Sequence, residues 1–233
     1  RIGPRLAAQV AISDAVAEAS GEAGRATVVH SGVPAPEQPP VPADERVPMV
    51  AMVQRMEPEK ATDVGLRAWA ASGLGERGWR LEVVGRGSQL LVVERLAAEL
   101  GVGDSVRFRG WVRDARAVLA RASMLLAPCP IDGFGLTVVE AMAAGTPVVA
   151  AAAAGHLETV GSVGDRWLFA PGDAEAGGVL LRELAGDAAE RRRYGAALAA
   201  AHAERFSVAG HAAALDGVYA GVVRSSPSAS GAR

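Results

Sequence analysis

The sequence predicts an α/β fold in which a parallel β-sheet is covered by helices on both faces. Short apolar stretches alternate with longer helical ones through residues 47–186, and this strand–helix repetition is typical of a parallel, Rossmann-like sheet. The composition agrees, because 50% of the 233 residues are hydrophobic and only 4% are aromatic. Such a mixture suits helices packed closely on a sheet.

The N-terminal part, residues 1–33, is a small piece outside the main alternation. The stretch QVAIS at 9–13 is typical of a short strand, and Ser13 or Asp14 then caps a helix. ATVVHSGVP at 26–34 indicates a second short strand. Residues 34–46 follow, and the six prolines from Pro34 to Pro48 keep this stretch from regular structure, so we interpret it as a linker.

The main domain, residues 47–206, contains alternating strands and helices. The predicted strands are 47–53, 80–85, 105–112, 124–128, 147–152 and 167–170. The predicted helices between and after them are 61–73, 89–101, 114–122, 136–144, 155–160 and 174–186. Two helical stretches, 188–205 and 208–224, follow without a strand, so 207–224 is expected to be a C-terminal helix. The polar residues 225–233 are expected to be disordered.

Composition also limits the partners that we expect. A formal net charge of −2 and a pI near 6.1 give no electrostatic footprint for nucleic acid. The single cysteine, Cys129, excludes an internal disulfide, fits a reducing compartment and is expected to be a buried structural thiol. Charges break the apolar runs well short of the roughly 20 residues that a membrane span needs. Without a signal peptide pattern, we expect a cytoplasmic protein, and nothing in the sequence indicates membrane contact.

In a parallel sheet a ligand lies at the carboxyl ends of the strands, where loops lead into helices. Three loops of the predicted sheet meet at this edge. They are QRMEPEK at 54–60, GRGSQ at 85–89 and CPIDGFG at 129–135.

The loop CPIDGFG is the strongest candidate for a binding site. Gly133 and Gly135 let the backbone approach a ligand closely or adopt a positive φ. The helix that follows has free backbone N–H groups at its start, which form a natural site for an anion. The residues that carry these groups are Gly135, Leu136, Thr137 and Val138.

Two carboxylates flank this helix start. Asp132 lies just before the helix and Glu140 lies about 7.5 Å along its axis, so that the pair can address two ends of one elongated polar ligand. One such ligand carries sugar hydroxyls at one end and ribose hydroxyls at the other, on either side of a diphosphate. A structural alternative stays open, in which Asp132 caps the helix and Glu140 is a solvated helix residue.

The other two loops add cations and glycines. Arg55 and Lys60 can clamp a diphosphate from the side opposite the helix start, although exposed cations are common on any surface. Gly85 and Gly87 form a G-x-G pattern at the end of the second strand, which a tight strand-to-helix turn also requires.

Together these features resemble the retaining, nucleotide-sugar-dependent glycosyltransferases of the GT-B fold, which include glycogen synthase. The family pattern E-G-F-G-L-x-x-x-E-A-M-A-x-G-x-P-V-V-A stands here as DGFGLTVVEAMAAGTPVVA at 132–150. Companion motifs are VVGRG, RFRGWV, the degenerate AGHLETV and FAPGD. The resemblance covers about residues 7–222 and implies that the chain is the C-terminal half of a GT-B fold. Residues 1–33 would then be the end of the N-terminal acceptor domain.

The resemblance also implies roles for single residues. Arg55 and Lys60 would hold the donor diphosphate, and Glu140 would bind the ribose hydroxyls. Asp132 replaces the family's glutamate, which contacts the donor sugar and stabilises charge around the reacting centre. The backbone of Phe134–Val138, which includes Phe134, would cradle sugar and phosphate, and Gly85 would leave room for the nucleotide.

This chain departs from the family pattern at several of these positions. Asp132 is one methylene shorter than the family's glutamate, so that its contact with the sugar is expected to shift or to suit a different sugar. Gln54 stands where the family has glycine before the arginine. Ala154, His156 and Leu157 alter the G-G-x-P-E motif and leave Gly155 and Glu158.

The resemblance implies an enzyme that transfers a sugar from a nucleoside-diphosphate sugar to an unknown acceptor. It implies neither a metal nor a cofactor apart from this co-substrate, and the rest of the N-terminal domain would be the chain's partner. A nucleotide-sugar-binding or regulatory module without turnover is the alternative. A third class, GT-B epimerases or phosphorylases, is disfavoured by EAMAAGTPVVA.

Overall fold

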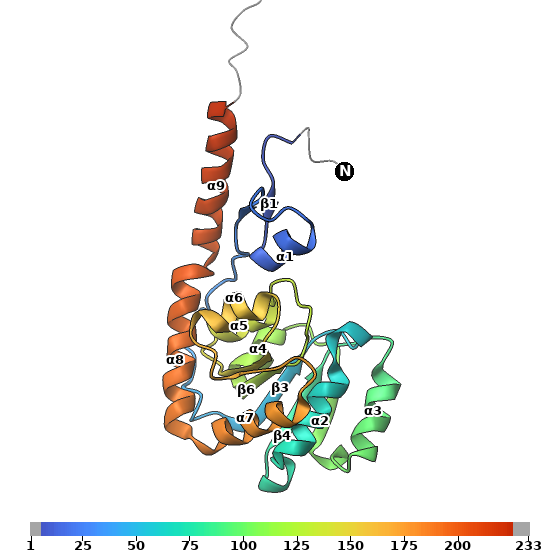
Figure 1. Cartoon of the computed structure of the whole chain (residues 1–233). Helices are drawn as coiled ribbons and strands as arrows, with labels where there is room; N and C mark the ends of the chain where they lie inside the picture. Colours follow the sequence, from blue (N-terminus) through green and yellow to red (C-terminus); the bar gives the residue numbers. More distant parts are fainter. Residues whose placement is uncertain (1–5, 226–233) are drawn as a thin grey trace, which may run out of the picture.

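The computed structural model describes residues 6–225, and its main body is a sheet of six parallel strands (Figure 1). The strand order is β5–β4–β3–β6–β7–β8. The strands are β3 (Val47–Val53), β4 (Arg80–Val84), β5 (Val106–Gly110), β6 (Ala122–Ala127), β7 (Val148–Ala151) and β8 (Leu168–Phe169). Each lies within two residues of its predicted bounds, and the predicted α/β fold is confirmed.

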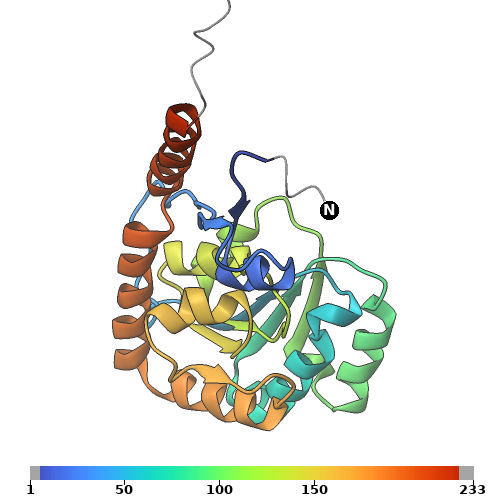
Figure 2. The ribbon, with the colours of Figure 1, turned by 45° about the horizontal axis from the view of Figure 1, so that its top comes forward.

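Helices cover both faces of this sheet (Figure 2). On one face α2 packs against α3 and α7, and on the other α5 packs against α4 and α8. The helices are α2 (Thr62–Ser72), α3 (Leu90–Glu99), α4 (Ala115–Arg121), α5 (Leu136–Ala143), α6 (Gly155–Thr159), α7 (Ala174–Gly186) and α8 (Ala188–Arg205). Single 3-10 turns lie at Pro58–Lys60, Gly75–Arg77, Gly103–Ser105 and Val160–Ser162.

The core lies between the sheet and these helices. All residues of β6 and β7 are buried, as expected for parallel strands covered on both faces. The largest fully buried side chains include Trp69, Phe134, Phe206 and Met52. The chain runs from β3 outward to β4 and β5 and then returns to β6 on the other side of β3, so the strand order reverses between β3 and β6.

The N-terminal segment forms a separate small unit. It consists of β1 (Val10–Ala11), α1 (Asp14–Ala19) and β2 (Thr27–Val28), and its two strands pair in parallel. Ser13 caps α1 as predicted, because its hydroxyl accepts a hydrogen bond from the N–H of Val16. The unit lies above α6 (Figure 1).

The last helix, α9 (Val208–Ser225), continues from α8 and leaves the main body beside the N-terminal unit (Figures 1 and 2). The ring nitrogen Nδ1 of His211 lies 2.7 Å from the carbonyl oxygen of His30. The predicted disordered tail, 225–233, lies outside the described residues except for Ser225. No helix among residues 6–225 is long and apolar enough to cross a membrane.

Residues 34–46 contain no helix or strand, but they are fastened to the main domain by Arg46. Its guanidinium donates to the carbonyl oxygens of Ala122 (3.1 Å) and Ala144 (2.6 Å) and to the hydroxyl of Thr146 (2.6 Å). Burial lowers the pKa of Arg46 to about 10. The predicted linker is therefore packed along the domain where β6 begins.

Candidate functional site

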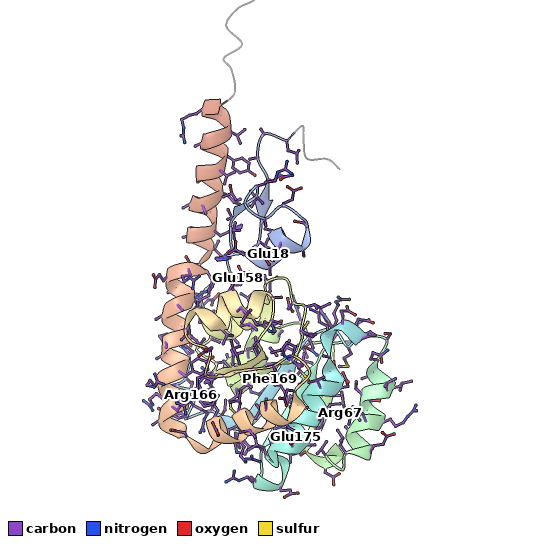
Figure 3. The ribbon with its side chains drawn as sticks, in the orientation of Figure 1. Glu18, Arg67, Glu158, Arg166, Phe169 and Glu175 are labelled. Carbon is purple, nitrogen blue, oxygen red and sulfur yellow. The ribbon has the colours of Figure 1, made fainter. Side chains whose placement is uncertain are left out.

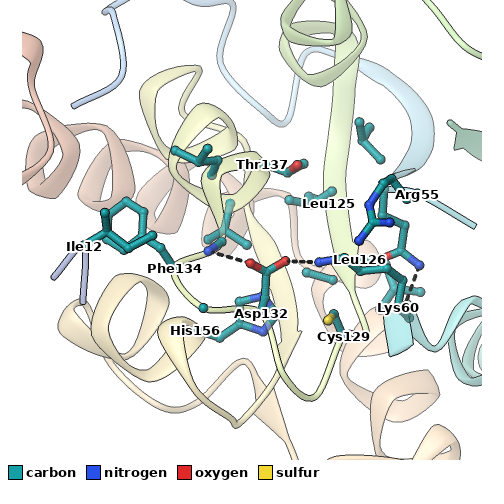
Figure 4. A pocket seen from close by; sticks show the side chains of 17 residues that line it. Ile12, Arg55, Lys60, Leu125, Leu126, Cys129, Asp132, Phe134, Thr137 and His156 are labelled. Carbon is teal, nitrogen blue, oxygen red and sulfur yellow. Dashed lines mark hydrogen bonds and ion pairs between the residues drawn. The ribbon is translucent and has the colours of Figure 1, made fainter. Parts of the chain in front are cut away.

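The reversal of strand order between β3 and β6 creates a crevice at the carboxyl ends of these two strands. A hollow of about 350 Å³ lies there, and we call it the first hollow (Figure 4). It is lined by the loop after β3, the turn after β6, the start of α5 and Ile12 from the N-terminal unit. The structure brings together here the predicted residues Arg55, Lys60 and Asp132, with Gly133, Phe134, Gly135, Leu136, Thr137 and Val138.

Lys60 and Asp132 meet in the centre of this hollow. The Nζ of Lys60 lies 2.9 Å from Oδ2 of Asp132, and both side chains are largely shielded from solvent (Figure 4). Burial alone would raise the pKa of Asp132, but the hydrogen bond and charge of Lys60 outweigh it and lower the pKa. Burial would likewise lower the pKa of Lys60, but Asp132 raises it. Both groups are therefore charged at neutral pH.

Asp132 also holds the start of α5. Its Oδ1 accepts a hydrogen bond from the N–H of Gly135 at 2.9 Å, and Gly135 has a φ of +82°, which favours glycine. The first bond within the helix runs from the N–H of Val139 to the carbonyl of Gly135. The N–H groups of Leu136, Thr137 and Val138 therefore precede the helical ladder and remain available to an anion.

Arg55 and Gln54 occupy the loop after β3. The Arg55 side chain is 67% exposed and pairs with Glu59 at 3.0 Å, so it is more open to solvent than Lys60. The amide of Gln54 donates to the carbonyl oxygen of Lys60 and to the hydroxyl of Thr62, both at 2.9 Å. Gln54, which the sequence marks only as a departure from the family, thus fixes the turn that presents Lys60.

A second hollow of about 500 Å³ adjoins the first and shares Val53, Gln54, Arg55 and Thr137 with it. Its wall includes the exposed ring of Trp111, and the Arg86 guanidinium lies 5.4 Å from the centre of that ring. Sequence reasoning missed Trp111 and Arg86 as individual residues. The signal was their position in the two motifs RFRGWV and VVGRG, which follow adjacent strands.

Gly85 and Gly87 line this second hollow, and both lie directly against the loop after β3. A Cβ on Gly85 would lie 1.9 Å from the carbonyl oxygen of Gln54, and one on Gly87 would lie 2.1 Å from that of Met56. Both glycines therefore allow two strand ends to approach each other. The two glycines of the predicted G-x-G turn thus have a structural role, the close contact with the loop after β3, besides lining the second hollow.

Glu140 is set apart from the other predicted site residues. It lines a third hollow, on the side of α5 that faces α4 and residues 34–37, together with Asp114 and Arg116. Glu140 lies one helical turn beyond Thr137, which lines both other hollows. Burial raises the pKa of the Glu140 carboxyl, and the charge of Arg116 offsets this only in part.

Two further titratable groups lie under the turn. His156 is 1% exposed, and its Nδ1 lies 3.0 Å from the carbonyl oxygen of Ala151. Burial lowers the pKa of His156. Cys129 is buried as predicted, and its thiol donates to the carbonyl oxygen of Glu59 at 3.4 Å. Burial raises the pKa of this thiol, so it is a poor nucleophile at neutral pH.

The two adjoining hollows can bind an elongated anionic ligand. In the first, an ammonium group and a helix start face the same space, which favours phosphate groups. In the second, an exposed aromatic ring and the apolar side chains of Val53, Val84 and Val112 favour a flat ring system. A molecule with a planar group at one end and phosphates in the middle fits this order.

Comparisons with known proteins show to which family the chain belongs. The family model of the glycosyl transferases group 1 matches residues 36–199. The D-inositol 3-phosphate glycosyltransferase of Streptomyces avermitilis is 37% identical over 222 residues, which cover 85% of this chain and 47% of the relative. The 2-deoxystreptamine glucosyltransferase of Streptomyces kanamyceticus is 35% identical over 127 residues, or 54% of this chain and 33% of the relative. The chain therefore spans about half the length, or less, of these relatives.

Solved structures show the same fold. The structure of Anabaena HepE in complex with UDP-glucose superposes with a TM-score of 0.80 and 21% identity, over 94% of this chain and 65% of that one. The structure of TarM from S. aureus superposes with a TM-score of 0.81 and 15% identity, over 96% of this chain and 45% of that one. At identities this low, the solved structures support only the fold. The family is supported by the family model, which matches most of the chain. The chain belongs to the group 1 glycosyltransferases, which have the GT-B fold.

Proposed function

We propose that this chain forms the donor half of a retaining glycosyltransferase that transfers a sugar from a nucleoside-diphosphate sugar to a separate acceptor. One observation carries the proposal. Lys60 and the start of α5 face each other across the first hollow, and the aromatic second hollow adjoins it. This order matches the order of sugar, diphosphate and base in such a donor.

The donor diphosphate would lie between Lys60, the more exposed Arg55 and the first N–H groups of α5. When the bond between the sugar and the diphosphate breaks, negative charge develops on the leaving phosphate oxygens. Fixed cations and helix N–H groups stabilise that charge without rearrangement, since they are already in place before the reaction. The proposal therefore requires no metal ion for the leaving group.

Asp132 would contact the donor sugar and keep the local charge balanced. Both of its oxygens are engaged, one by Lys60 and one by the N–H of Gly135. Its pKa is lowered, so it holds no proton at neutral pH and is a weak base. These contacts support a role in binding and charge stabilisation rather than in removing a proton from the acceptor, and they agree with the retaining course that we propose.

The first prediction tests donor binding. We expect UDP-glucose, the nucleotide sugar bound in the HepE structure, to raise the melting temperature of the chain and to bind measurably in calorimetry. GDP-mannose and ADP-glucose, tested in parallel, report on selectivity for the base. If none of the three nucleotide sugars stabilises the folded chain at millimolar concentration, the proposed function is wrong.

The second prediction concerns Glu140, which we propose binds the ribose hydroxyls from its position one turn beyond Thr137. Glu140→Gln keeps one acceptor but removes the charge. We expect it to weaken binding of UDP itself, about 3- to 10-fold, because the hydrogen bonds from the ribose hydroxyls then go to a neutral rather than a charged acceptor. An effect on UDP-glucose with none on UDP would contradict the ribose assignment.

Although Glu140→Gln should weaken UDP binding, we expect it to stabilise the fold of the free chain. A carboxyl whose pKa is raised on folding destabilises the fold above that folded pKa, and the penalty disappears as the pH falls through it. We therefore expect Glu140→Gln to melt at or above the wild-type temperature at pH 8, with the difference vanishing near pH 4. Melting curves across this pH range check the expectation.

A further inference from the structure

Two short helices, α1 and α6, hold the turn from Asp132 to Gly135 through hydrogen bonds to its carbonyl groups. Gly155, the first residue of α6, donates its N–H to the carbonyl oxygen of Asp132 at 2.9 Å. Ser13, the N-cap of α1, donates its hydroxyl to the carbonyl oxygen of Gly133 at 2.5 Å. Two successive carbonyl groups of the turn are therefore bound by two different elements.

Glu158 joins these two helices to each other. It lies on α6 and points toward α1 (Figure 3), where its two carboxylate oxygens accept the N–H groups of Asp14 and Ala15, each at 2.9 Å. The Nε2 of His30 lies 3.2 Å from the same carboxylate. The turn, α6 and α1 thus form a closed ring of contacts, with at least one hydrogen bond between each pair.

The link between α1 and the turn is tight and closed to solvent. Ser13 is 0% exposed. A Cβ on Gly133 would lie 2.9 Å from the side chain of Val16, so α1 packs directly on the turn. Gly155 is equally close on the other side, because a Cβ there would lie 2.3 Å from the Cα of Phe134.

The orientation of the turn's N–H groups depends on these contacts. In a trans peptide the C=O and N–H groups point in opposite directions, so a Gly133 carbonyl held by Ser13 directs the Phe134 N–H away from α1. Within residues 6–225 the Phe134 N–H has no acceptor. Gly133 has no Cβ to restrict its backbone, so this peptide could rotate if the carbonyl were released.

We propose that Ser13 is a positioning residue for donor binding, because its hydroxyl fixes the peptide between Gly133 and Phe134. The proposal rests on the proposed function, since the turn is the part of the donor site nearest the sugar and the diphosphate. It assigns the segment before residue 34 a part in the donor site. Ile12, which lines the first hollow, lies next to Ser13 in the same segment.

The test compares two ligands in four forms of the chain. Ser13→Gly removes the donor hydroxyl but keeps α1 capped, because glycine is tolerated at an N-cap. Ser13→Thr retains the hydroxyl. Ser20→Gly is the matched control, since Ser20 lies at the other end of α1 and its hydroxyl bonds only within that helix, to Ala17. The affinities of each form for UDP-glucose and for UMP are measured by calorimetry.

We expect Ser13→Gly to bind UDP-glucose about 3- to 10-fold more weakly, the loss equivalent to one neutral hydrogen bond. UMP, which lacks the sugar and the second phosphate, should bind equally to all four forms. Ser13→Thr and Ser20→Gly should match the wild type with both ligands. Equal loss of both ligands in Ser13→Gly, or no loss of either, would overturn the positioning role.

Amide hydrogen exchange on the free chain separates this proposal from the proposed function. Ser13→Gly should speed exchange in residues 130–140, while Ser20→Gly should not. Failure of the wild type to bind UDP-glucose would count against the proposed function, whereas unchanged exchange in Ser13→Gly would count against the role of Ser13 alone.

Discussion

Replacing Lys60 by methionine is expected to weaken UDP binding by about 1.5–3 kcal/mol, or about 10- to 150-fold. The ammonium group of Lys60 is largely shielded and faces the start of α5 across the first hollow. A charge-assisted bond to phosphate at such a shielded position is stronger than one at an open surface. Methionine keeps the length and apolar character of the side chain and removes the charge.

Arg55→Ala is the matched variant for this experiment. Arg55 borders both hollows, but its side chain is 67% exposed and already pairs with Glu59. Its loss should weaken UDP binding by less than about 1 kcal/mol, in the range of exposed ion pairs. Calorimetry at low and high salt measures both variants. If Lys60→Met binds UDP as tightly as the wild type at low salt, Lys60 does not hold the diphosphate.

Replacing Asp132 by asparagine is expected to have the opposite effect on UDP binding. In the free chain it forms the ion pair with Lys60, so a bound diphosphate must share or replace this partner. Asp132→Asn removes the competing charge, and we expect UDP to bind this variant at least as tightly as the wild type. Binding of UDP-glucose should not improve to the same extent, because Asp132 is proposed to contact the sugar.

The fold could be predicted from the sequence because each strand is buried on both faces. Burial on both faces produces short, continuous apolar runs such as those of β6 and β7, and these runs stand out between amphipathic helices. Local signals accompany the helix bounds, since Ser13 caps α1 as predicted and Asp173 and Asp187 cap α7 and α8 in the structure. Such signals lie within a few residues of the structure that they determine.

The candidate site could be predicted only in part. Lys60 and Asp132 could be assigned to the same edge of the sheet, since they follow adjacent parallel strands. Their direct pairing could not, because it depends on how Gln54 folds the loop after β3. The placement of Glu140 beside residues 34–37 depends on the path of a segment without regular structure.

The contacts between segments that are distant in the sequence could not be predicted, because no local sequence pattern indicates them. Ser13 and Gly133 are 120 residues apart, and Ser13 is explained locally by its role as the N-cap of α1. Its second hydrogen bond, to the carbonyl oxygen of Gly133, arises from the packing of α1 on the turn. Residues of this kind follow from tertiary packing, which a single sequence does not display.

Gly85→Ala is expected to cost about 3–5 kcal/mol of folding stability, the largest effect on stability that we expect. Two causes add. Gly85 has a φ of +140°, which side chains other than glycine rarely adopt, and a Cβ would lie 1.9 Å from the carbonyl oxygen of Gln54. That carbonyl belongs to backbone rather than to a flexible side chain, so the end of β3 must move for the alanine to fit.

Gly164→Ala separates the two causes, because Gly164 has nearly the same φ, +145°, but nothing lies within 4 Å of the position that an alanine methyl group would occupy there. This control should cost only about 1–3 kcal/mol, the backbone strain alone. Urea unfolding measures both variants. In the fraction of Gly85→Ala that remains folded, UDP should bind more weakly than to Gly164→Ala, because a displaced Gln54 no longer holds the turn that presents Lys60. If the two alanine variants were equally stable, the close approach of the strand ends at Gly85 would not limit this fold.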